Sequence, residues 1–363
     1  MSGFSYRLSI AVICGVAALG LAPGCGGDGA PSPTDTVVPD AADRAPLDSG
    51  AGDSAPEDAA AHDGSSANDA NDGGRPDPNT DGPHAYTERD ATTTVAGTGD
   101  TVAIHVAYPN AAGPFPVVVF AHGFQLPPSQ YYGYLKRLAS FGYVALTVDF
   151  PTSLAGNDNP KQAKDLIGGI DWAKNDATIG SKVDATKAGM SGHSLGGKLA
   201  LLAATMDARV KASLVLDPVD SGGPGGCTAP ACVVVKSLVS SLAIPTGFLG
   251  ETTDGTGGFQ ACAPVADNFT TFYAQAKTPS LQVTALGANH MSFLDNVSTC
   301  GFTCSFCNAA TASNAQVNGM ARALMVAFYE RHLRGDAAYE TYLTGVESKA
   351  RYVTTNQATI TSK

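Results

Sequence analysis

The sequence predicts an α/β fold with a mostly parallel central sheet and helices on both faces. From about residue 88, strand-like and helix-like segments alternate along the chain, which is typical of this architecture. Two strand-like segments, 115–123 and 143–150, are continuous apolar runs, as expected of parallel strands covered on both sides. The 363 residues also leave room for one large α/β domain.

The other segments follow the same alternation. Residues 101–109 alternate apolar and polar side chains as a half-buried strand does, and 129–142 have helical spacing that ends at Gly142. The next predicted helix covers 159–176, with Asn159 as its cap and Pro160 at its first position. Beyond Ser194 the prediction is a helix over 195–206, strands over 210–219, 244–251 and 280–290, and a helix over 319–336.

The first 25 residues have the features of an export signal. Arg7 precedes an apolar run rich in small residues, and "PGC" follows it. Cys25 resembles the lipidated cysteine of a bacterial lipoprotein, which predicts a membrane anchor. The alternative is cleavage by an ordinary signal peptidase and release of a secreted protein.

Residues 26–85 are expected to form a disordered linker. They contain 13 acidic and two basic residues, so the net charge of this segment equals the formal net charge of the whole chain, −11. A chain so poor in large apolar side chains cannot offset the entropy cost of ordering, and its like charges extend it. The catalytic domain is therefore predicted over 86–363, and the acidity gives no information about a substrate.

The cysteines of the predicted domain favour disulfides over a metal site. Six remain after Cys14 and Cys25, an even number in an exported chain. No zinc-binding spacing is complete among them. Their pairing is open, with a local Cys227–Cys232 pair as one guess, and the six are Cys227, Cys232, Cys262, Cys300, Cys304 and Cys307.

The candidate nucleophile is Ser194, in the pentapeptide Gly192-His193-Ser194-Leu195-Gly196. The motif alone is weak evidence, because the chain contains 41 glycines. Its position between a predicted strand and a predicted helix fits a nucleophile on a sharp turn, where glycines allow strand and helix to approach closely.

A serine hydroxyl needs a base and an orienting acid. His290 follows the last strand of the predicted sheet and is the expected base. The acid stays open on spacing alone. Asp217 ends the strand after the nucleophile helix, Glu251 and Asp254 follow the next strand, and Asp220 is a weaker alternative. The chain order of serine, acid and histidine is the order that α/β-hydrolases use.

From about residue 95 to 350 the chain resembles an α/β-hydrolase of the chlorophyllase-like group. The matching stretches are "AHGFQLPPSQYYGYLKRLASFGY", "GHSLGGK", "LVLDPVD", "GFLGE…CAPVADNF" and "GANHMSFLD". The resemblance implies an α/β-hydrolase fold and Asp217 as the triad acid. The more distant cutinases would instead imply Glu251 or Asp254. Leu195 stands where plant chlorophyllases commonly have a basic residue.

The fold class also predicts an oxyanion hole made of backbone N–H groups. Leu195, directly after the nucleophile, is one expected donor, and Phe124, after the strand 115–123, is the other. The residues expected to contact substrate are Gln125, Leu126, Tyr131, His193 and Met291.

The resulting hypothesis is a serine carboxylic-ester hydrolase that forms an acyl-enzyme and acts on apolar or bulky esters. The alternatives are a polyester-degrading cutinase or lipase-type hydrolase, and a non-catalytic surface protein on a hydrolase fold. The mechanism requires no metal and no organic cofactor. The expected partners are small-molecule or polymeric esters and, through Cys25, a membrane; no feature predicts nucleic-acid binding, and a monomer is expected.

Overall fold

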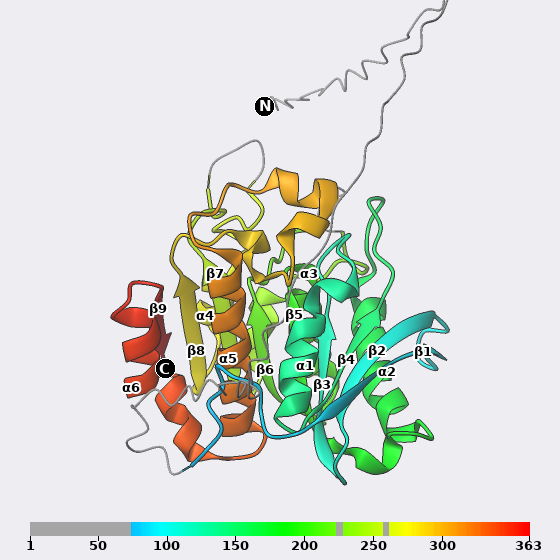
Figure 1. Cartoon of the computed structure of the whole chain (residues 1–363). Coiled ribbons are helices and arrows are strands. Elements are labelled where there is room, and N and C mark those ends of the chain that lie inside the picture. Colours follow the sequence, from blue (N-terminus) through cyan, green and yellow to red (C-terminus); the bar gives the residue numbers. More distant parts are fainter. Residues whose placement is uncertain (1–73, 223–227, 257–260) are drawn as a thin grey trace, which may run out of the picture. The chain divides into compact units, whose positions relative to one another are not determined.

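The computed structural model describes residues 74–222, 228–256 and 261–363. The predicted export signal, Cys25, Cys227 and most of the predicted linker lie outside these residues. The described strands form one sheet in the order β1-β2-β4-β3-β5-β6-β7-β8-β9 (Figure 1). Their bounds are β1 Tyr86–Thr94, β2 Thr101–Pro109, β3 Phe115–Ala121, β4 Val144–Asp149, β5 Val183–His193, β6 Val210–Leu216, β7 Thr246–Glu251, β8 Ser280–Ala285 and β9 Ala358–Ser362.

The centre of the sheet is parallel. β3 pairs in parallel with β4 and β5, and the parallel pairing continues through β6 and β7 to β8. The β1–β2, β2–β4 and β8–β9 pairs at the two edges are antiparallel. This arrangement confirms the predicted fold class, a mostly parallel sheet of the α/β-hydrolase type.

Helices cover both faces of the sheet, and the sequence of β3 reflects this burial on two sides. Val118 and Phe120 point into one core, with α1 (Tyr132–Ser140) and α5 (Asn314–His332). Val117 and Val119 point into the other core, with α2 (Asn159–Asn175), α3 (Leu195–Met206) and α4 (Phe269–Gln275). Since successive side chains of a strand alternate between faces, a strand buried on both sides must be apolar throughout, as β3 is.

Short helical segments complete the described chain. They are η1 Pro128–Tyr131, η2 Gly180–Lys182, η3 Lys236–Ser241, η4 His290–Phe293, η5 Val297–Thr299, η6 Gly301–Phe306, η7 Ala337–Tyr342, α6 Val346–Ser348 and η8 Lys349–Val353. No helix built from the described residues has both the length and the apolar character that crossing a bilayer requires.

Several details differ from the predicted elements. The two edge strands β1 and β9 were not predicted, because β1 is polar at most positions and β9 is short. The cap of α2 is Asp158 and not Asn159: the Asp158 carboxylate accepts a hydrogen bond from the N–H of Lys161 at 3.0 Å. An aspartate satisfies a free helix N–H as well as an asparagine does.

Residues 74–85, which the sequence assigns to the linker, are attached to the domain. Asp77 forms an ion pair with Arg351 (2.9 Å), and the hydroxyl of Tyr352 donates to the side chain of Asn79 (2.7 Å). The folded part therefore begins before Tyr86.

The carboxyl ends of the parallel strands gather the residues that the sequence predicts to be functional. Phe124 follows β3, Ser194 follows β5, Asp217 follows β6 and His290 follows β8. Ligands of open α/β sheets bind at this edge, outside the carboxyl ends of the strands. The topology thus brings residues that are far apart in sequence to one edge of the sheet.

Candidate active site

Ser194 lies at the sharp turn between β5 and α3. Its backbone has φ +57° and ψ −122°, and residues other than glycine rarely adopt a positive φ. Three hydrogen bonds hold this conformation. The Ser194 N–H donates to the carbonyl of Leu216 (3.0 Å), and the Ser194 carbonyl accepts from the N–H groups of Lys198 (3.1 Å) and Val219 (3.3 Å). The turn buries the residues on both sides of Ser194 and leaves Ser194 itself half-buried.

The glycines around Ser194 permit close packing of backbones. A Cβ at Gly196 would collide with the carbonyl oxygen of Ala121, at the end of β3, and would lie 2.5 Å from that of His122. A Cβ at Gly192 would collide with the carbonyl oxygen of Gly196. The expectation that these glycines let strand and helix approach is confirmed. The start of α3 thereby lies directly beside the loop that follows β3.

His290 and Asp217 form a buried pair. The Nδ1 of His290 lies 2.6 Å from the Oδ2 of Asp217, and both side chains are almost completely buried. Because an ionised carboxylate only accepts hydrogen bonds, Nδ1 carries the proton of a neutral imidazole. This leaves the lone pair on Nε2, which is the atom that a general base uses. Asp217 also has a positive φ, +38°, so its position after β6 is conformationally special.

The surrounding charges shift the pKa values of both partners. Burial alone lowers the pKa of His290, but the hydrogen bond and the charge of Asp217, together with the charges of Asp254 and of ionised Glu251, raise it above its ordinary value. Burial raises the pKa of Asp217, and the hydrogen bond to His290 opposes that shift. The pair is therefore arranged to stabilise a positively charged imidazole.

Asp254, one of the alternative acids, holds the backbone of the histidine loop. Its Oδ2 accepts from the N–H of His290 and its Oδ1 accepts from the N–H of Asn308, both at 2.7 Å. Its two oxygens are thus committed to main-chain donors. Among the described residues, Asp217 is the carboxylate that reaches the imidazole of His290.

Glu251 and Asp220 have other partners. Glu251 Oε2 accepts from the N–H of Thr253 and from that of Asp254 (2.9 Å), which shapes the turn after β7. Burial, with the nearby charge of Asp217, raises the pKa of Glu251 to about 7. Asp220 forms a buried ion pair with Lys198 at 3.3 Å. Neither side chain forms a hydrogen bond with His290 among the described contacts.

The predicted oxyanion donors lie on the two backbones that the glycines bring together. Leu195 is the first residue of α3, and the first N–H groups of a helix have no acceptor inside it. In the loop after β3, the N–H of Gly123 is already used, since it donates to the hydroxyl of Tyr131 (3.2 Å). That leaves the N–H of Phe124 as the next donor in this loop, and the Phe124 side chain is half-buried.

The residues expected to contact substrate divide into two groups. Gln125 is exposed, has φ +54°, and donates to the carbonyl and hydroxyl of Thr152. Leu126 and Met291 are buried, with 4% and 6% of their surface accessible. Tyr131 and His193, in contrast, have no accessible surface and are hydrogen-bonded to each other (2.8 Å). The structure therefore places these two side chains beneath the site and not at its surface.

The described cysteines are paired. Cys262 is bonded to Cys307 and Cys300 to Cys304. Cys232 is also disulfide-bonded, and Cys227, its predicted partner, lies outside the described residues. Asp254 lies near the Cys262 and Cys307 sulfurs in a group of metal-ligand type. A metal needs thiolates, however, and this sulfur pair is a disulfide, so the group does not fit an ion.

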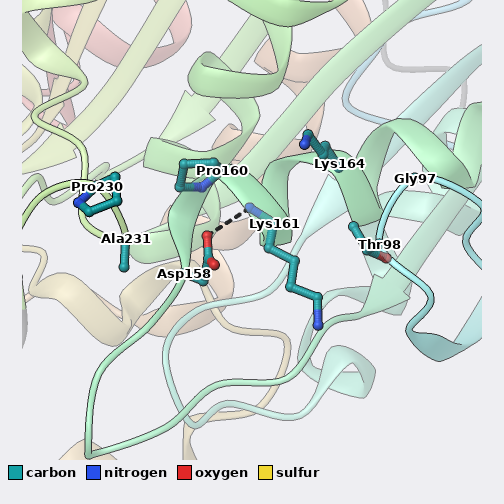
Figure 2. A pocket seen from close by; sticks show the side chains of 8 residues that line it. All are labelled: Gly97, Thr98, Asp158, Pro160, Lys161, Lys164, Pro230 and Ala231. Atoms are coloured by element: carbon teal, nitrogen blue, oxygen red, sulfur yellow. Dashed lines mark hydrogen bonds between the residues drawn. The ribbon is translucent and has the colours of Figure 1, made fainter.

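A surface cavity of about 410 Å³ lies elsewhere. Residues of the β1–β2 turn, the start of α2 and the segment 230–231 line it, among them Thr98, Lys161 and Lys164 (Figure 2). None of the residues predicted to be functional belongs to its lining, so this cavity is separate from the site around Ser194.

Comparison with known proteins shows which family the chain resembles. A family model described as chlorophyllase matches residues 79–354, well over half of the chain. Chlorophyllase-1 of Arabidopsis thaliana is 28% identical over 254 residues, which cover 65% of this chain and 77% of the relative. Cutinase 2 of Thermobifida cellulosilytica is 26% identical over 175 residues, 48% of this chain and 58% of the relative. A bis(hydroxyethyl) terephthalate hydrolase of Streptomyces coelicolor is 31% identical over 115 residues, 31% of this chain and 36% of the relative.

The raised pKa of Glu251 predicts a specific effect of pH on stability. The folded protein keeps the Glu251 proton up to about pH 7, whereas the ordinary pKa of 4.5 applies in the unfolded chain. The free energy of unfolding therefore falls as pH rises across this window. Glu251→Gln retains an oxygen that accepts the two N–H groups but does not titrate. Urea unfolding at pH 5 and pH 8 should show wild type losing about 1–2 kcal/mol relative to the variant. Parallel pH dependence of the two proteins would contradict the assignment.

Proposed function

We propose that this chain, which belongs to the chlorophyllase family of carboxylic ester hydrolases, cleaves esters through Ser194, His290 and Asp217. The observation that carries the proposal is the buried bond of 2.6 Å between His290 Nδ1 and Asp217 Oδ2, formed at the sheet edge where Ser194 occupies a strained turn. A serine, a base and an acid in these roles define a nucleophilic triad.

The proposed reaction has two halves. In the first, His290 Nε2 takes the proton of the Ser194 hydroxyl while Oγ attacks the ester carbonyl carbon. The resulting oxyanion accepts hydrogen bonds from the N–H groups of Leu195 and Phe124. When the tetrahedral intermediate collapses, the C–O bond to the alcohol breaks and His290 gives its proton to the leaving oxygen.

In the second half, a water molecule takes the place of the alcohol. His290 removes one of its protons, the hydroxide oxygen attacks the acyl carbon, and the bond to Ser194 Oγ breaks as His290 returns the proton to that oxygen. The carboxylic acid leaves and the free serine is restored. Throughout both halves, Asp217 keeps the Nδ1 proton directed and stabilises the imidazolium that forms twice in each cycle.

The triad predicts a steep and selective response to substitution. Ser194→Ala and Asp217→Asn should each lower kcat for a soluble p-nitrophenyl ester by about 10⁴-fold or more. Glu251→Gln should lower it less than about tenfold, because Glu251 bonds main-chain groups and not the imidazole. A fluorophosphonate probe should label wild type and not Ser194→Ala. Substantial activity in Ser194→Ala would contradict the mechanism, and an unlabelled wild type would favour a non-catalytic surface protein.

We further propose that the substrates are apolar or bulky esters. The loop after β3 and the residue after His290 contribute Phe124, Leu126 and Met291, and apolar side chains favour apolar ligand groups. The relatives named above support the same proposal, since they are a chlorophyllase, a cutinase and a terephthalate hydrolase. The runner-up is a polyester-degrading cutinase or a lipase-type enzyme.

A substrate panel separates these possibilities. We expect kcat/KM for p-nitrophenyl esters to rise at least about tenfold from acetate to a medium-length acyl chain. Each well-packed methylene in an apolar pocket stabilises the transition state by about 1–3 kcal/mol. Chlorophyll and bis(hydroxyethyl) terephthalate should be tested beside them. Product release from a solid polyester film would favour the cutinase alternative. A preference for acetate would contradict an apolar acyl site.

The location of the protein is proposed from its first residues alone. We propose export and lipid attachment at Cys25, which would place the domain at the end of a long acidic linker. Cys25→Ser should move the protein from the membrane fraction to the soluble fraction, measured by fractionation and immunoblotting of expressing cells. Wild type found only in the soluble or secreted fraction would instead support cleavage by an ordinary signal peptidase.

A further inference from the structure

A line of buried hydrogen bonds runs beneath the proposed site, from the loop after β3 to the histidine loop. The N–H of Gly123 lies 3.2 Å from the hydroxyl oxygen of Tyr131, which lies 2.8 Å from Nδ1 of His193. The Nε2 of His193 lies 2.9 Å from the backbone carbonyl oxygen of His290. Tyr131 and His193 have no accessible surface.

The chemistry of the partners fixes the direction of every bond in this line. The carbonyl of His290 only accepts, so Nε2 of His193 must donate to it. Burial, with the charge of His290, holds the pKa of His193 well below its usual range, so this imidazole is neutral. Its Nδ1 is then an acceptor, and the hydroxyl of Tyr131 donates a hydrogen bond to it. The Tyr131 oxygen in turn accepts the N–H of Gly123.

The groups around these hydrogen bonds are packed so closely that a shift of one displaces its neighbours. A Cβ at Gly123 would lie 2.7 Å from Leu126 Cδ1 and 3.2 Å from both His193 Nδ1 and the Tyr131 hydroxyl, so a side chain here would displace these neighbours. The His193 ring also lies against the ring of His290, with centroids 4.6 Å apart. A shift of the His193 ring would therefore move the loop after β3 and the histidine loop, since it is bonded to both through these contacts.

We propose that Tyr131 and His193 are positioning residues. They set the distance between the loop after β3, which carries the proposed Phe124 donor, and the catalytic His290. This inference rests on the proposed function. His193 precedes the nucleophile in the chain, so the Tyr131–His193 pair links the three parts of the site: the Phe124 donor beside Gly123, the Ser194 turn, and the backbone of His290. Neither side chain touches the substrate; both act through the groups they hold.

The variant Tyr131→Phe tests this role. It keeps the ring and removes the hydroxyl, so Gly123 N–H and His193 Nδ1 both lose their partner. Because a small misplacement of reacting groups is costly, we expect kcat for a soluble p-nitrophenyl ester to fall about 10–100-fold while KM stays within about twofold. His193→Gln removes the acceptor at Nδ1 and should lower kcat to a similar extent. The double variant should be no worse than the poorer single variant, because both substitutions break the same bond.

Tyr329→Phe is the matched control. Tyr329 is another tyrosine without accessible surface, and its hydroxyl bonds Ser191 (2.7 Å) and the carbonyl of Met190 (3.0 Å) on β5. It should lower the melting temperature about as much as Tyr131→Phe does, yet leave kcat within about twofold of wild type. Equal losses of kcat in the two variants, or an unchanged kcat in Tyr131→Phe, would overturn the proposal.

Two further outcomes keep the test decisive. If Tyr131→Phe does not fold, His193→Gln carries the same comparison against Tyr329→Phe. If Ser194→Ala still hydrolyses the ester, the proposed function fails, and the positioning role fails with it. An inactive Ser194→Ala beside a fully active Tyr131→Phe overturns the positioning role alone.

Discussion

The hydrogen bond between Asp217 and His290 is the interaction on which the rest of the site depends. It joins two loops separated by 73 residues of sequence and lies in a region closed to solvent. A buried carboxylate is costly unless its charge is compensated, and here the imidazole provides the compensation. The nearby charge of Asp254, and that of Glu251 once it loses its proton near pH 7, favour the imidazolium further. The same arrangement that makes Asp217 tolerable in the interior also makes His290 a stronger base.

The backbone supplies what the side chains cannot. Ser194 keeps a strained conformation because its N–H and its carbonyl are held by partners on β6, on α3 and in the loop after β6. Gly196 allows the start of α3 to lie against the end of β3, which brings close together the two backbones that carry the proposed oxyanion donors. Beneath them, the pair of Tyr131 and His193 bonds the loop after β3 to the histidine loop. The proposed nucleophile, oxyanion donors and base therefore all lie on backbone segments that these contacts hold in place.

Much of this arrangement is predictable from sequence, and the limits have physical reasons. The apolar runs of β3 and β4 predict a parallel sheet because both faces of each strand must be buried, whereas the polar β1 and the short β9 carry no such signal. Ser194 and His290 stand out by chain order and by their places after strands. Tyr131 and His193 were predicted as substrate contacts, because motif position locates a residue near a site without indicating which way its side chain points. The helical spacing of the apolar residues around Tyr131 was the signal that could have indicated that its side chain points into the core.

The acid shows why spacing could not decide among several carboxylates, and how bonding does. Asp217 follows β6, Glu251 ends the adjacent strand β7 and Asp254 lies three residues later, so each is near the histidine loop. The three carboxylates differ in the hydrogen bonds that their oxygens accept. Both oxygens of Asp254 accept main-chain N–H groups, and Glu251 Oε2 accepts two more. A carboxylate committed to fixing a turn cannot also rotate to orient an imidazole. Asp217 receives no such main-chain donor at Oδ2 and directs this oxygen at His290. Asp254 holds the histidine loop through the N–H of His290, and Glu251 shapes the turn after β7 that carries Asp254.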